Sequence, residues 1–174
     1  NLREMSLEGN RFRRFDASKY PSLVTLALTD NLLTSIDISD NKNLELLSVS
    51  YNSLSDIVMD NDKLWALYLD NNNISEIDLS GVPQLKQLSI SNNYLSQINV
   101  ANLDNLIMLI INNNYFTFET LPLHKPTYVR YYYHSQFPIE ITDEGGVVDL
   151  SSQSYVDGAA TIYRWFVGLP TVDE

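Results

Sequence analysis

Few side chains in this chain have the types and spacing that catalysis or metal binding requires. The two histidines, His124 and His134, stand apart from any motif that would combine a nucleophile with a base. Zinc needs three or four ligands, and two distant histidines without cysteine do not supply them. We therefore predict no catalytic residues, no metal site and no cofactor, and we expect that the protein is not an enzyme.

Two acidic runs resemble fragments of calcium loops. They are Asp60-Asn61-Asp62 and Asp70-Asn71-Asn72. A complete calcium loop spaces its oxygen ligands regularly and ends in a bidentate glutamate, and both runs lack these features. We interpret the runs as turns whose polar side chains satisfy nearby backbone groups.

Charge and cysteine content exclude several classes of partner. The chain has 174 residues, no cysteine and a formal net charge of −11. This sign of charge disfavours nucleic acid and anionic membranes as ligands. The one basic cluster, formed by Arg11, Arg13, Arg14 and Lys19, is interpreted as a solvated edge. No apolar run is long enough for direct insertion into a membrane.

The most regular feature of the chain is an asparagine that follows a leucine by eight residues, six times over. The period is 20 or 21 residues, which is typical of a solenoid whose repeats bury their apolar faces against one another. A carboxamide donates and accepts hydrogen bonds, so we expect these side chains to bridge the backbones of successive repeats as a ladder. The leucines are Leu2, Leu23, Leu44, Leu64, Leu85 and Leu106, and the asparagines are Asn10, Asn31, Asn52, Asn72, Asn93 and Asn114.

Each of the six repeats contains a short segment in which apolar residues alternate with polar ones, and the first five contain a second such segment. The fifth repeat shows both, as Leu88-Ser89-Ile90 and Ile98-Asn99-Val100. A period of two is that of a strand with one buried side. The outer half of a repeat, about ten residues long, has little room for a two-turn helix and its connections. The pattern predicts short parallel strands, with extended segments on both sides of the coil and little or no α-helix.

Residues 2–118 resemble the leucine-rich repeat family. The stretch Leu85-Lys86-Gln87-Leu88-Ser89-Ile90-Ser91-Asn92-Asn93-Tyr94-Leu95 matches the LxxLxLxxNxL pattern of that family. Because LxL-like segments occur twice in 21 residues, the repeat is similar to the short bacterial subtype called IRREKO, found in surface and secreted proteins. The resemblance implies a right-handed solenoid with a concave, ligand-binding strand face, and a location outside the cytoplasm.

The C-terminal third resembles the segment that follows such repeats in surface proteins of Bacteroides-like bacteria. The resemblance rests on short patches, among them Tyr131-Tyr132-Tyr133-His134-Ser135-Gln136-Phe137-Pro138 and Thr161-Ile162-Tyr163-Arg164-Trp165. It implies a closing strand followed by the opening strands of an Ig-like β-sandwich. The alternation over 128–133 predicts that the closing strand pairs with the last repeat.

We expect three segments along the chain: a repeat array at 1–118, a capping extension at 119–137 and a β-strand module at 138–174. The module has strand patterns at Ile139–Ile141, Val147–Leu150 and Thr161–Val167. Three strands are too few for an independent sandwich, so the Ig-like module is expected to be partial. An exposed edge carrying Trp165 would invite self-association with a second copy.

The outward positions of the first strands form a mostly small and polar surface with one aromatic residue near its middle. This residue is Tyr68, with Asp70 beside it and Gln87 on the next repeat, and Leu46 and Met108 add apolar surface on either side. An aromatic side chain with polar neighbours is a typical anchor for a peptide or a sugar. We predict a non-catalytic surface or secreted binding module that recognises a protein or a glycan through this face. The alternatives are a structural spacer and an accessory module of a larger surface protein or enzyme.

Overall fold

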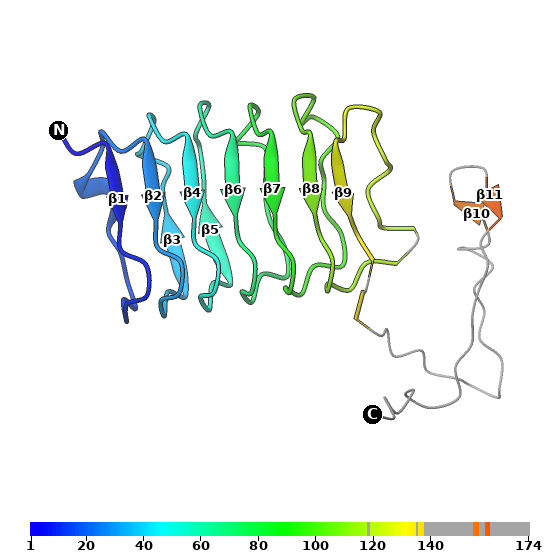
Figure 1. Ribbon diagram of the computed structural model, residues 1–174, viewed down its shortest axis with the longest axis horizontal. Helices are drawn as coiled ribbons and strands as arrows, with labels where there is room; N and C mark the ends of the chain where they lie inside the picture. The colour runs from blue at the N-terminus through cyan, green and yellow to red at the C-terminus, as the bar shows by residue number, and fades with distance from the viewer. Residues whose placement is uncertain (118, 135, 138–154, 157–158, 161–174) are drawn as a thin grey trace. The chain divides into compact units, whose positions relative to one another are not determined.

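The computed structural model describes residues 1–117, 119–134, 136–137, 155–156 and 159–160. The chain divides into two compact units, Asn1–Ile139 and Glu140–Glu174. The first unit is a β-solenoid in which each turn of the coil contributes one short strand to a single parallel sheet, called here the front sheet (Figure 1). This arrangement confirms the fold class predicted from the repeat period.

Seven strands form the front sheet, and all neighbours are parallel. Their register has no slip, so that the buried Leu26 lies opposite Leu47 and Leu88 lies opposite Leu109. The last strand is the one expected within 128–133, and it pairs with the sixth repeat as predicted. In order, the strands are β1 (Glu4–Ser6), β2 (Thr25–Ala27), β4 (Leu46–Ser48), β6 (Ala66–Tyr68), β7 (Gln87–Ser89), β8 (Met108–Ile110) and β9 (Arg130–Tyr132).

The opposite side of the coil, called here the return side, is extended but only partly paired. β3 (Ser35–Asp37) and β5 (Asp56–Val58) form a two-stranded parallel sheet, and η1 (Ala17–Lys19) is a single turn of 3₁₀ helix. The equivalent residues 76–78 and 97–99 belong to no strand. The described residues include no α-helix, and therefore no helix with the length and apolarity to cross a membrane.

The core is a column of aliphatic side chains that runs between the front sheet and the return side. Five of the six leucines that open the repeats, Leu23, Leu44, Leu64, Leu85 and Leu106, are completely buried. Each such burial contributes roughly 1.5–3 kcal/mol relative to an exposed side chain. Tyr128 takes the leucine position in the seventh turn and is also buried, so an aromatic ring covers the end of the column.

A deletion in the third repeat brings two turns of the coil into close contact. This repeat, from Leu44 to Leu64, has 20 residues instead of 21, and the missing residue falls in the turn around Asp60. A Cβ atom on Gly81 of the next repeat would lie 2.4 Å from the carbonyl oxygen of Met59. The Asn61 N–H donates to the Gly81 carbonyl at 2.7 Å. The approach is therefore so close that the fourth repeat needs glycine at this position.

The second unit is described at two strands. β10 (Tyr155–Val156) and β11 (Ala159–Ala160) pair antiparallel. Neither strand is among those predicted from the sequence. The expected strands Ile139–Ile141, Val147–Leu150 and Thr161–Val167, and the expected edge at Trp165, lie outside the described residues and stay predictions.

Candidate binding face

The ladder asparagines hold the turn that follows each front strand, and they thereby position the face of the sheet. The Asn72 Nδ2 donates to the Leu69 carbonyl in its own repeat and to the Val49 carbonyl in the preceding one, both at 3.0 Å. Its Oδ1 accepts from the Leu54 N–H at 2.9 Å. Equivalent bonds to two repeats are made by Asn31, Asn52, Asn93 and Asn114. Asn10 donates within its own repeat.

A glutamine continues the ladder in the seventh turn. The Gln136 Oε1 accepts from the Phe116 N–H at 3.3 Å, and its Nε2 donates to the Ile111 carbonyl at 3.1 Å. Gln136 is not among the ladder residues predicted from the sequence. The signal was present, because Gln136 follows Tyr128 by the same eight residues that separate each leucine from its asparagine. The described residues of the segment 119–137 thus form a further turn of the coil, and the role of this segment as a cap stays a prediction.

The residue before each ladder asparagine adopts a left-handed backbone conformation. In the six repeats its φ lies between 55° and 65°, and the residues are Gly9, Asp30, Tyr51, Asn71, Asn92 and Asn113. Glycine, asparagine and aspartate tolerate this region, whereas a bulky side chain is strained there. Tyr51 is the exception in this column, and its side chain is 59% exposed at the margin of the front face.

A second set of buried amides lies in the turn that precedes the front strand. The Asn41 Nδ2 donates to the carbonyls of Ala17 and Tyr20, and the Asn61 Nδ2 donates to those of Ile38 and Asn41. Both asparagines are completely buried. These hydrogen bonds confirm the interpretation of Asn61 as a turn residue whose side chain satisfies backbone groups, and they place that side chain in the interior, where it bridges two repeats.

The front face contains the predicted aromatic residue in a fixed orientation. The Tyr68 hydroxyl donates to the Gln87 Oε1 across two adjacent strands at 2.5 Å. Burial raises the pKa of the Tyr68 hydroxyl and the nearby Asp70 charge raises it further, so the group remains a donor at neutral pH. Leu46 on β4 and Met108 on β8 are half-buried and flank this pair on the neighbouring strands.

Asp70 belongs to a hydrogen-bond network that crosses several repeats. Its Oδ1 accepts from the Ser89 Oγ at 2.7 Å and from the Ser91 N–H at 2.8 Å. The Asp70 N–H donates to the Ser50 Oγ, and the Ser91 Oγ donates to the Asn112 Oδ1. Asp70 therefore stabilises the face, and its role as a ligand contact stays a prediction.

β9, the last strand of the front sheet, adds two residues to the face that the prediction does not include. Arg130 pairs in register with Met108, and Tyr132 pairs with Ile110. Both side chains are exposed. The face between β6 and β9 therefore presents tyrosine, methionine, isoleucine and arginine side chains.

The residues first considered for chemistry have other roles. Among the described residues, no group of three or more His, Cys, Asp or Glu side chains is arranged to hold a metal ion. Asp60 forms an ion pair with Lys42. The His124 ring lies 5.8 Å from the rings of Tyr128 and Tyr131 in an aromatic cluster.

Residues 84–106 match the family model described as Leucine Rich Repeat. The crystal structure of the leucine-rich repeat domain of APL1B is similar at 21% identity, covering 67% of this chain and 42% of that chain, with a TM-score of 0.46. The functional domain of InlJ from Listeria monocytogenes, which includes a cysteine ladder, matches at 16% identity over 89% of this chain and 52% of that one, with a TM-score of 0.29. This chain spans about half the length of these two structures.

The repeat pattern and the observed coil define the fold class of the protein. In the part of the chain that the structure describes, it is a β-solenoid with almost no helix, and residues 84–106 of this coil match the leucine-rich repeat family model. Repeat proteins of this class present an extended surface, and they commonly use that surface to bind other proteins.

Proposed function

We propose that this protein is a non-catalytic module that binds a protein or a glycan through the front sheet, with Tyr68 as the anchor. The observation that carries the proposal is the Tyr68–Gln87 hydrogen bond, which orients an aromatic ring in the middle of a face of mostly small residues. An aromatic side chain that is already ordered loses little conformational entropy when a ligand binds.

The chemistry of the exposed side chains favours a protein partner over a glycan. The polar groups around Asp70 already satisfy one another, so a partner need not replace their hydration. The groups that remain available include Tyr68, Met108, Arg130 and Tyr132. Tyrosine, methionine and arginine are enriched at protein interfaces.

The proposal includes a location outside the cytoplasm, on a cell surface or in secreted form. It rests on the resemblance of the 21-residue repeat to the IRREKO subtype of bacterial surface and secreted proteins. A bacterial origin belongs to the same proposal.

The proposal is tested by screening the protein against arrays of secreted proteins and of glycans, and then measuring the affinity of variants for the strongest ligand. Tyr68→Ala should weaken binding by at least about tenfold, the effect of losing a central aromatic anchor. Tyr68→Phe should have an intermediate effect, because the ring remains and the hydrogen bond to Gln87 is lost. Tyr94→Ala is the matched control, because Tyr94 is an exposed tyrosine outside the front strands. A ligand that binds Tyr68→Ala as tightly as the parent would contradict the proposal.

A structural spacer or an accessory module of a larger surface protein is the second candidate function. The N-terminal half of the front face favours it, because hydroxyl groups there bond to one another, as Thr29 and Ser48 do at 2.8 Å. A spacer would tolerate Tyr68→Ala in the full-length protein with no loss of function, whereas a binding module would not.

A further inference from the structure

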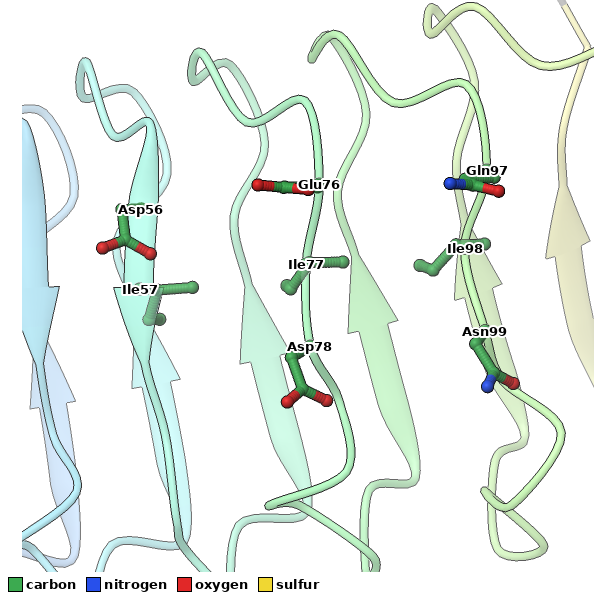
Figure 2. A pocket seen from close by; sticks show the side chains of 8 residues that line it. All are labelled: Asp56, Ile57, Glu76, Ile77, Asp78, Gln97, Ile98 and Asn99. Carbon is green, nitrogen blue, oxygen red and sulfur yellow. The ribbon is translucent and has the colours of Figure 1, made fainter.

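The return side of the third to fifth repeats contains a groove of about 520 Å³ that the front-face function does not use (Figure 2). Its floor is a row of isoleucines, Ile57, Ile77 and Ile98, one from each repeat. The side chains of Asp56, Glu76 and Gln97 form one wall, and those of Asp78 and Asn99 form the other.

The groove exists because backbone pairing on the return side stops at β5. In the described part of the chain, no backbone hydrogen bond joins β5 to residues 76–78, or those residues to 97–99. The third and fourth repeats are nevertheless tied at both ends of the gap. The Asn73 N–H donates to the Leu54 carbonyl at 2.8 Å, and the Asn61 N–H donates to the Gly81 carbonyl. An added strand therefore has no room to insert between the repeats, and a ligand must lie across them.

The walls of the groove carry negative charge that the described residues do not neutralise. Asp56, Glu76 and Asp78 are exposed, and the two ion pairs in the described part of the chain involve other carboxylates. The Ser80 backbone N–H donates to the Asp78 Oδ1 at 2.9 Å and lowers the pKa of that carboxyl group, which keeps it ionised.

We propose that this groove binds an extended cationic segment of another protein, laid along the row of isoleucines. Apolar side chains of the segment would cover Ile57, Ile77 and Ile98, and the long lysine or arginine side chains between them would bend so that their charged ends reach the carboxylates of the walls. A second copy of the chain is a poor occupant, because two molecules with a net charge of −11 repel each other. This site is independent of the front face.

The test uses fluorescence anisotropy with a labelled peptide of four lysines alternating with three valines. The triple variant Asp56→Asn, Glu76→Gln, Asp78→Asn should weaken binding by about tenfold or more, since each exposed ion pair contributes up to about 1 kcal/mol. Asparagine is compatible with the turn at position 78, because Asn99 makes the equivalent bond to the Ala101 N–H. The matched control is Asp40→Asn, Asp62→Asn, Asp104→Asn, which removes the same charge from exposed positions outside the groove. It should change the affinity by less than about twofold.

A second peptide, with serine in place of valine, tests the apolar floor. It should bind roughly fivefold more weakly, because it carries the same charge with less apolar surface. The proposal is overturned if the lysine–valine peptide shows no saturable binding, if both triple variants weaken it equally, or if the two peptides bind equally well.

Sedimentation velocity of the unlabelled protein tests the remaining candidate occupant of the groove, which is a second copy of the chain. Self-association that the groove variant abolishes would assign the groove to a second copy, through the Arg11, Arg13 and Arg14 cluster, and would overturn the proposal. Tyr68→Ala should leave peptide binding unchanged, so failure at one face is distinguishable from failure at the other.

Discussion

Each turn of the coil reverses direction twice, and the two reversals are built differently. The first reversal follows the front strand, and there every one of the seven turns has a carboxamide side chain, ending with Gln136. The second reversal precedes the next front strand. Its equivalent position is less uniform and holds Tyr20, Asn41, Asn61, Val82, Leu103 and Lys125.

The reason lies in how the backbone is satisfied at each reversal. The second reversal closes with its own backbone hydrogen bonds, such as Val82 N–H to the Leu79 carbonyl and Leu103 N–H to the Val100 carbonyl, both at 3.2 Å. At the first reversal, buried carbonyls of two repeats need a side-chain donor. The comparison teaches that a solenoid requires a polar side chain only where its backbone cannot close the turn alone.

The largest expected effect is at the first reversal. Asn72→Ala removes the donor to the buried carbonyls of Val49 and Leu69 and the acceptor for the Leu54 N–H. It should lower the free energy of unfolding by about 3 kcal/mol, measured by urea denaturation. Asn73→Ala, at the next and exposed position, should be nearly neutral. An unchanged midpoint for Asn72→Ala would show that the ladder does not stabilise the coil.

The next effect concerns the shortened turn of the second reversal. Gly81→Ala places a Cβ atom 2.4 Å from the Met59 carbonyl oxygen and should cost about 2 kcal/mol through overpacking. Asp40→Ala at the equivalent position of the full-length second repeat is the control, with a change below about 0.5 kcal/mol. Equal stability of Gly81→Ala and the parent would mean that the two repeats separate without cost.

A smaller loss is expected at Asn41. Its Oδ1 is buried without a hydrogen-bond partner among the described residues, and Leu103 fills the equivalent position two repeats beyond Asn61. Asn41→Leu should therefore cost only about 1 kcal/mol, because the lost bonds to Ala17 and Tyr20 are offset in part by removing that orphaned acceptor. If thermal denaturation shows a loss as large as that of Asn72→Ala, the two reversals depend equally on their amides.

At the first reversal, one substitution should stabilise the protein. Tyr51 has a φ of 56°, where four of the other repeats have asparagine or aspartate. Tyr51→Asn should raise the free energy of unfolding by about 1 kcal/mol through relief of backbone strain. Tyr94→Asn, which replaces an exposed tyrosine outside this column, should give no gain. A destabilised Tyr51→Asn variant would show that the ring makes contacts that outweigh the strain.

The smallest effect is a pH dependence on the return side. The Ser39 hydroxyl and backbone N–H donate to the Asp37 carboxylate and lower its pKa below the usual 3.8. Because the folded-state pKa is depressed, the resulting stability is present above the unfolded-state pKa and is lost as the pH falls through the folded-state value. When the pH is lowered below about 4, the melting temperature of Asp37→Asn should therefore fall less than that of the parent. Parallel pH profiles would contradict this assignment.

Much of the fold could be predicted from the sequence because the apolar period and the asparagine spacing are local and repeat six times. Gln136 escaped prediction because Tyr128 replaces the leucine that would have aligned it. The burial of Asn41 and Asn61 was hidden by charged neighbours such as Lys42 and Asp62, which are typical of solvent-exposed turns. Backbone strain at Tyr51 could have been predicted, because the other repeats have glycine, aspartate or asparagine at the equivalent position.

The candidate sites were less accessible to sequence reasoning. The alternation placed Tyr68 and Gln87 on one face, but their hydrogen bond depends on side-chain orientation between adjacent strands. The use of Asp70 as a brace depends on Ser89 and Ser91 of the next repeat. The return-side groove depends on backbone bonds that are not formed between repeats, and residue types do not encode such a gap directly.

The contact between Met59 and Gly81 limits how this gene region can be rearranged. Repeats that meet through identical surfaces can be duplicated, deleted or exchanged singly by recombination. The third repeat can be followed only by one with glycine at this position, so it must move together with the fourth as a unit of two.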